Sequence, residues 1–362
     1  MKEFIKDIYT CASCGYCKFG CPVNKQIGFE SFSAKGRMLI LKNIYEKKLP
    51  YNNEIIDSIY ACSECGNCSQ MCPTGINYEE IMTTIKKEIV EMDKLPQSQK
   101  IIRNNIEKEY NPFAEKKEER GLWTSKKSTK SKYLYFVGCS ASYSSNRIPK
   151  SITKILDMIK FDYTILGNDE VCCGDPLEKM GEIEKANNLL KQNIEKIKEL
   201  EVETIFASCS GCYKNFKKKL SKEFKVKHIT ELLSDLIKEG KISFKDFSKK
   251  VIYADGCDLG RHSGIYEEPR KILKSIPKLE LLEFDYNRKE SICCGGPLMA
   301  SYPSLSRKIA AEKIKEAFEK KADLIATSCP TCFVNLKEGA KESGIEIEIQ
   351  DIPLLLPKLV KS

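Results

Sequence analysis

The arrangement of cysteines constrains the fold of this sequence more than any other feature. The 362 residues include 18 cysteines, and all of them fall into two patterns that each occur twice. Paired matches of this length indicate internal duplication at two scales. The front motifs are Cys11, Cys14, Cys17 and Cys21, repeated as Cys62, Cys65, Cys68 and Cys72; the rear sets are Cys139, Cys172, Cys173, Cys209 and Cys212, repeated as Cys257, Cys293, Cys294, Cys329 and Cys332.

So many cysteines indicate either a disulfide framework in an oxidising compartment or metal ligation in a reducing one. The N-terminal sequence M-K-E-F-I-K-D-I-Y-T lacks the apolar core of a secretory signal. No run approaches the roughly 18 apolar residues that predict a membrane span. We therefore expect a cytoplasmic protein without a transmembrane segment, peripheral to a membrane only through a partner, whose cysteines bind metal.

Both front motifs have the spacing Cys-x2-Cys-x2-Cys-x3-Cys-Pro, which is similar to the ligand run of bacterial two-cluster ferredoxins. Three cysteines at this spacing wrap one [4Fe–4S] cubane, with Gly15 and Gly66 easing the turns, and the fourth reaches the neighbouring cluster. Structural zinc, the alternative, normally uses two separated pairs of ligands. We therefore predict two cubanes, one held by Cys11, Cys14, Cys17 and Cys72 and the other by Cys62, Cys65, Cys68 and Cys21.

The formal charge of +9 comes from 60 Lys and Arg against 51 Asp and Glu, and such an excess is one mark of nucleic-acid binding. That count treats cysteine as neutral, whereas a cluster held by four thiolates carries about −2. The lysines are also spread along the chain and form no aromatic-rich basic module. We therefore expect no nucleic-acid partner.

The sequence up to residue 95 is predicted to be helical. Asn77 is the expected N-cap of one helix, with Glu80 three residues later, and Ile81, Ile85 and Ile89 form its apolar stripe. The following stretch, 96–131, is rich in Lys and Glu and is predicted to be a linker. Its N-P-F sequence and the single tryptophan, at position 123, suggest that part of it docks.

Each later repeat alternates predicted strands and helices. Runs at 133–137 and 251–254 end just before a cysteine, and runs at 204–208 and 324–328 lead directly into the Cys-x-x-Cys pairs. Amphipathic helices are predicted from Ile183, Ala186, Leu189, Leu190, Ile194 and Ile197, and from Leu305, Ile309, Ala310, Ile314, Ala317 and Phe318.

The predicted fold class is α+β multidomain, with an N-terminal helical two-[4Fe–4S] ferredoxin domain and two α/β lobes related by a pseudo-twofold axis. Its predicted parts are the ferredoxin domain at 1–95, the linker at 96–131, the first lobe at 132–245 and the second lobe at 246–362.

The Cys-Cys-Gly doublets set a geometric condition. In extended backbone neighbouring side chains point to opposite faces, so both sulfurs face one inorganic core only if the chain bends there. Gly174 and Gly295 permit the positive φ of such a bend. The Cys-x-x-Cys pairs open predicted helices, whose N-terminal amides favour an anionic cluster. Zinc, or one ordinary cubane per repeat with a spare thiol, is the alternative.

The first rear set, C-x32-C-C-G-x34-C-x2-C, resembles the cysteine-rich CCG domain of heterodisulfide reductases. The same domain occurs in iron–sulfur partners of flavin-linked glycolate, lactate and glycerol-3-phosphate dehydrogenases. The resemblance covers nearly the whole chain, including D-G-C-D-L-G-R-H-S-G-I-Y-E-E-P-R at 255–270 and the N-P-F linker motif with Arg120 and Trp123. It implies that the five cysteines of each rear set hold one noncubane [4Fe–4S] cluster, beside the two cubanes in front.

Two functions follow from this resemblance. The first is an oxidoreductase subunit whose two rear clusters each deliver one electron to a small disulfide, with a flavoprotein, ferredoxin or cytochrome subunit as redox partner. The second is a relay that accepts electrons from an FAD-linked 2-hydroxy-acid dehydrogenase. The stretch S-F-S-A-K-G-R at 31–37 resembles the S-P-R-G-R of such relays, and mildly favours the second function.

Other residues add little chemistry. Only two histidines are present, which excludes a His-based metal site or a Ser-His-Asp triad. His228 is predicted to end a strand, and His262 to have a capping role, with proton donation or anion binding as the alternative. No nucleotide-binding glycine motif is present, so any flavin is expected in a partner. No catalytic side chain is assigned.

Overall fold

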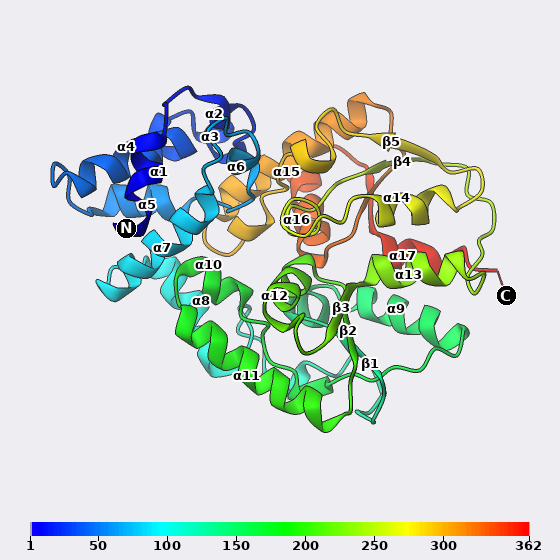
Figure 1. The fold of residues 1–362 in the computed structure, drawn as a ribbon. Helices are drawn as coiled ribbons and strands as arrows, with labels where there is room; N and C mark the ends of the chain where they lie inside the picture. The colour runs from blue at the N-terminus through cyan, green and yellow to red at the C-terminus, as the bar shows by residue number, and fades with distance from the viewer. Residues whose placement is uncertain (1, 362) are drawn as a thin grey trace.

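The computed structural model describes residues 2–361 and places a helical part beside two α/β lobes (Figure 1). The apolar stripe of Ile81, Ile85 and Ile89 is buried as predicted, and Ile102 and Ile106 complete the same core. The helices of this part are α1 (Ile5–Thr10), α2 (Tyr16–Phe19), α3 (Pro22–Ile27), α4 (Ala34–Tyr45), α5 (Asn53–Tyr60), α6 (Asn67–Gln70), α7 (Tyr78–Glu91) and α8 (Gln97–Glu109).

Two expectations for this part need correction. Asn77 precedes α7, but its side chain makes no capping hydrogen bond; the Tyr78 N–H donates to Ser69 Oγ at 2.8 Å instead. The predicted linker contains helix α8, whose short apolar stripe is diluted by charged residues in the sequence. The expectation that part of this segment docks is confirmed, since Trp123 is buried in the core of the lobes.

The first lobe is built on a parallel sheet with the order β1-β2-β3. A parallel bridge between Leu134 and Thr164 extends the sheet at the β1 edge. Every residue of β2 is buried, as is usual for a parallel strand covered by helices on both faces. The elements are β1 (Tyr133–Phe136), α9 (Arg147–Met158), α10 (Asp175–Met180), α11 (Ile183–Glu199), β2 (Thr204–Ala207), α12 (Ser210–Leu220), β3 (Lys225–His228) and α13 (Ile229–Lys238).

The second lobe repeats this topology in a parallel sheet with the order β5-β4-β6-β7. One side chain of its predicted amphipathic stripe differs from expectation: Phe318 is 61% exposed, because it lies at the solvent-facing end of α15. The elements are β4 (Lys250–Tyr253), α14 (Glu267–Lys274), β5 (Glu280–Glu283), α15 (Pro303–Glu319), β6 (Leu324–Thr327), α16 (Pro330–Ser343), β7 (Glu348–Asp351) and α17 (Ile352–Leu355).

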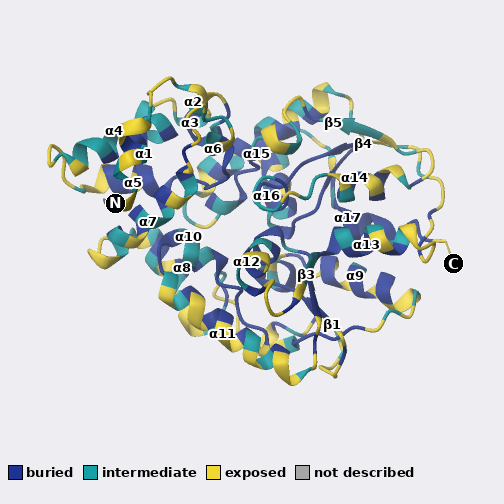
Figure 2. Cartoon of the chain, viewed as in Figure 1, coloured by how far each residue is buried: buried dark blue, intermediate teal, exposed yellow. Residues whose placement is uncertain are grey.

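The two lobes pack through equivalent helices. Helix α13 follows the last strand of the first lobe and packs on α14, while α17 follows the last strand of the second lobe and packs on α9. These two contacts exchange places under a pseudo-twofold axis, which agrees with the predicted symmetry. One buried core runs through both lobes, and Figure 2 shows the strands buried beneath helices with exposed outer faces. Within residues 2–361, every helix is too short or too polar to cross a bilayer.

Candidate functional site

The second front motif and the last cysteine of the first motif surround a common cavity of about 20 Å³. Its wall contains Cys21, Cys62, Cys65 and Cys68, which is the grouping that the crossed spacing predicts. Gly66 follows Cys65 with φ +75°, and a Cβ there would lie 2.3 Å from Glu79 Oε1. A glycine is therefore needed at this turn, both for its backbone angle and for the close approach.

Arg37 gives this cavity a positive wall. Its side chain is 1% exposed, its Nε donates to Ser58 O at 2.8 Å, and its Nη2 has no hydrogen-bond partner among the described residues. Burial raises the pKa of the Cys21 thiol to about 11, and the charge of Arg37 opposes that rise. An unpartnered guanidinium nitrogen beside four thiols fits an anionic [4Fe–4S] cluster of charge about −2.

The other front set lies nearer the surface. Cys11, Cys14 and Cys17 are close together: burial raises the pKa of Cys17, and the negative charges of the other two raise it further. Cys14 is exposed, and Gly15 has φ +86° as the turn requires. Cys72, assigned to this set by spacing, lies 3.2 Å from Thr74 Oγ1, and its membership of the set stays a prediction.

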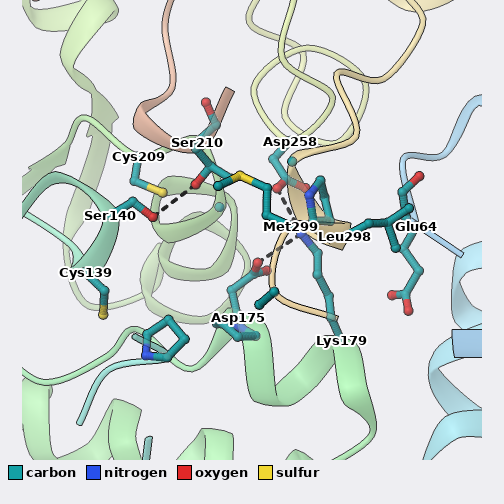
Figure 3. A pocket seen from close by; sticks show the side chains of 18 of the residues that line it. Glu64, Cys139, Ser140, Asp175, Lys179, Cys209, Ser210, Asp258, Leu298 and Met299 are labelled. Carbon is teal, nitrogen blue, oxygen red and sulfur yellow. Dashed lines mark hydrogen bonds and ion pairs between the residues drawn. The ribbon is translucent and has the colours of Figure 1, made fainter. Parts of the chain in front are cut away.

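The rear cysteines gather at one cavity of about 200 Å³ between the two lobes (Figure 3). The thiols of Cys209 and Cys329 hydrogen-bond across it, and Ser210 Oγ donates to Ser328 O at 3.1 Å nearby. Among residues 2–361 no three Cys, His, Asp or Glu side chains converge as ligands of a single metal ion would. The cysteines instead surround shared space; those lining this cavity are Cys139, Cys172, Cys173, Cys209 and Cys212 of the first lobe and Cys257, Cys294, Cys329 and Cys332 of the second.

Each doublet bends as the sequence analysis expects. Gly174 has φ +89° and Gly295 has φ +83°. The bend is held by an amide that the sequence analysis missed: Asn215 Nδ2 donates to Cys173 O, and Asn335 Nδ2 donates to Cys294 O, both at 2.6 Å. The signal was present in the sequence, because both asparagines occupy the same place after a Cys-x-x-Cys pair.

The remaining rear cysteine connects the site to the front of the chain. Cys293 packs against Cys257 of its own lobe and against Cys65 of the front cavity. Arg261 fixes this junction, since its Nε donates to Cys65 O at 2.7 Å and its Nη1 to Ser291 O at 2.6 Å. The front cavity and the rear cavity therefore meet at a contact between cysteine side chains.

The two histidines have structural roles. His228 ends β3 and is fully buried, and its Nδ1 accepts a hydrogen bond from the Thr230 N–H at the start of α13. Its predicted role is thus confirmed. His262 caps no helix; its Nε2 donates to Glu64 O at 3.0 Å and so ties the second lobe to the helical part. The capping role predicted for His262 is wrong.

A buried group of four charges forms part of the wall of the rear cavity. Lys179 Nζ lies 3.0 Å from both Asp175 Oδ2 and Asp258 Oδ2, and Lys214 Nζ lies 2.8 Å from Asp175 Oδ1 (Figure 3 shows three of the four). Burial opposes ionisation of Asp258, but the two lysines outweigh it and lower its pKa. The group joins the lobes, and sequence reasoning missed it because Asp258 comes from a distant part of the chain.

Comparison with known proteins identifies the domains. Residues 7–76 match the 4Fe-4S dicluster domain, and residues 133–217 and 251–337 each match the cysteine-rich domain CCG. An iron–sulfur subunit of dihydromethanophenazine:CoB--CoM heterodisulfide reductase from Methanosarcina acetivorans is 30% identical over 97% of this chain and 94% of its own. The chain belongs to this family of heterodisulfide reductase subunits. The corresponding protein from Methanosarcina barkeri is 28% identical over 96% of this chain and 93% of its own.

Membership of the heterodisulfide reductase family establishes the cofactor class. The dicluster domain and the two CCG domains account for four [4Fe–4S] clusters, and the chain is an iron–sulfur oxidoreductase subunit that works with redox partners. A hypothetical protein from Helicobacter pylori has the same fold, with a TM-score of 0.61 at 12% identity over 89% of this chain and 68% of its own.

One further relative is larger. The probable iron-sulfur-binding oxidoreductase FadF of Bacillus subtilis is 28% identical over 86% of this chain, which spans about half (49%) of FadF.

Proposed function

We propose that this protein reduces a small disulfide in the cavity between its two lobes. The observation that carries the proposal is the shared cavity, whose wall contains the whole first rear set and four cysteines of the second. The reaction breaks the S–S bond, takes two electrons from a reduced partner protein and two protons from water, and releases two thiols. A disulfide bound there would have one cysteine set on each side.

We further propose which residues hold the clusters. The front cubanes belong to the two crossed sets, and each rear set of five cysteines holds one noncubane cluster. When bound, these clusters supply one-electron transfer. The chain itself contributes the exposed position of Cys14, which suits electron exchange with a partner, and the contact between Cys65 and Cys293, which keeps the front and rear sites adjacent. We place the protein in the cytoplasm, at a membrane only through a partner.

The test uses the full chain with its clusters intact. Purified without oxygen, it should contain roughly sixteen irons. With a low-potential donor such as a reduced viologen, it should consume a mixed disulfide of two small thiols and release two thiols for each disulfide lost. The measurement is free thiol released against donor oxidised.

A relay without disulfide turnover is the second candidate. It is favoured by the EtfAB:quinone oxidoreductase of Syntrophomonas wolfei, 25% identical over 84% of this chain and 46% of its own, and by FadF. The stretch at 31–37 does not distinguish the two functions, because Ser33 caps α4 and Arg37 is buried beside the front cavity. Reduction of the chain by a flavoprotein, with no thiol release from any disulfide, would establish the relay instead.

A further inference from the structure

Arg120 lies in the segment between α8 and β1 and reaches the first rear set. Its side chain is 1% exposed, and its Nη1 and Nη2 lie 3.6 and 3.5 Å from Cys139 Sγ, to which both donate. The guanidinium is held in this orientation by Glu170, whose Oε1 accepts from Nε at 3.1 Å and from Nη2 at 2.6 Å.

Glu170 is itself fixed by the backbone that leads to Cys139. Its two carboxylate oxygens accept from the Val137 and Gly138 N–H groups, each at 2.8 Å. The carboxylate therefore aligns the arginine and the cysteine-bearing loop at the same time. The segment also contacts the doublet, because Tyr110 O accepts from the Cys172 N–H at 3.0 Å.

The second lobe treats its arginines differently. Arg270 is fully buried, but it pairs with Asp255 and Glu283. The hydrogen bonds of Arg261 go to oxygen atoms, including those of Cys65 and Ser291. Among the described residues, the forked contact from an arginine to a cysteine sulfur thus belongs to the first lobe, although the two cysteine sets repeat.

We propose that Arg120 is a positioning residue that raises the reduction potential of the cluster held by the first rear set, through its N–H groups on Cys139. This inference rests on the proposed ligand sets. Reduction adds one negative charge to a cluster, and hydrogen bonds to its sulfurs set its potential. A fixed positive charge with two N–H donors on a ligand sulfur stabilises the reduced form more than the oxidised form. The two rear clusters therefore differ in potential.

The test is a redox titration of the full holoprotein, followed by electron paramagnetic resonance. The variants are Arg120→Lys, which keeps a charge but loses the fork, and Arg120→Met with Glu170→Gln, which leaves no unpaired buried charge. The relevant signal is the one lost in Cys139→Ser and kept in Cys257→Ser. Its midpoint potential should fall in both variants, by more in the double variant, with iron content unchanged.

Arg270→Lys is the matched control, because it alters an equally buried arginine that pairs with two carboxylates and not with a cysteine. It should leave the first-lobe signal at its original midpoint. An unchanged midpoint in an Arg120 variant that keeps its iron would overturn the proposal, and so would loss of iron from every variant, since Arg120 would then only support the fold. The titration needs no disulfide, so a failure of the proposed catalysis would be seen separately.

Discussion

At the scale of single residues, each doublet depends on the glycine that follows it. A Cβ on Gly174 would lie 2.8 Å from Ala186 O, and one on Gly295 would lie 2.9 Å from Ser306 O. Both obstacles are backbone atoms of a neighbouring helix, so they cannot move aside as a flexible side chain would. Strain from the positive φ adds to this steric conflict.

Gly174→Val and Gly295→Val should therefore each lose the cluster of their own lobe. Iron content should fall by about a quarter from the roughly sixteen irons of four clusters. Gly240→Ala is the control, because Gly240 also has a positive φ of +72° but has open space where a Cβ would be. Full iron in the two valine variants would show that the bend is not needed.

The doublets also predict that neither cysteine of a pair is spare. Replacing Cys172, Cys173, Cys293 or Cys294 with Ser should alter the Mössbauer and electron paramagnetic resonance spectra of that lobe, because a hydroxyl is a poorer iron ligand than a thiolate. If one variant of each doublet kept wild-type spectra and iron, each rear cluster would need only four of its five cysteines.

At the scale of secondary structure, α7 is fixed by a buried ion pair between Lys86 and Glu64. Their side chains are 4% and 7% exposed, and Lys86 Nζ also donates to Lys179 O at 3.1 Å, at the end of α10. Removing one partner of such a pair leaves an uncompensated buried charge. The helix thus depends on one side chain for its contact with the first lobe.

Lys86→Met should accordingly lower the free energy of unfolding by about 3–5 kcal/mol. Lys130→Met removes a lysine from an exposed pair with Glu201 and should change it little. Urea unfolding followed by circular dichroism compares the two. Equal midpoints for both variants would contradict a structural role for the buried pair.

The sequence was informative where local pattern decides the structure. The strands before the Cys-x-x-Cys pairs end within one residue of their predicted ends, because apolar β-rich runs stop at polar, helix-opening residues. Helix α8 was missed because its two buried isoleucines, Ile102 and Ile106, stand among charged residues. The pairing of Asp258 with Lys179, and the contact of Cys65 with Cys293, join distant segments, and no local pattern encodes them.

At the scale of the whole molecule, the rear cavity exists only because the lobes face each other. Ser140 Oγ lies 3.1 Å from Thr331 Oγ1 across this boundary. Ala300 lines the cavity and is exposed to solvent, so it marks a side from which a substrate can enter. A large side chain at that position would narrow the approach without touching a cysteine.

Ala300→Trp should thus raise the KM for a mixed disulfide at least several-fold, while iron content and reduction by a viologen stay unchanged. Ala300→Ser, which keeps the side chain small, should behave as the unaltered protein. Steady-state thiol release over a range of disulfide concentrations provides the measurement. An unchanged KM in the tryptophan variant would place the approach to the cavity elsewhere.

The contact of Cys65 with Cys257 and Cys293 also bears on how the protein is made. A ribosome releases the helical part and the first lobe before the second lobe exists, so on the nascent chain the rear cavity has only one wall. The thiols of the first rear set are then open to oxygen, and free thiols oxidise readily when exposed. Iron delivery to the rear sites must therefore wait until Cys332 has left the ribosome, and the growing chain needs an oxygen-poor cell interior until its second lobe has docked.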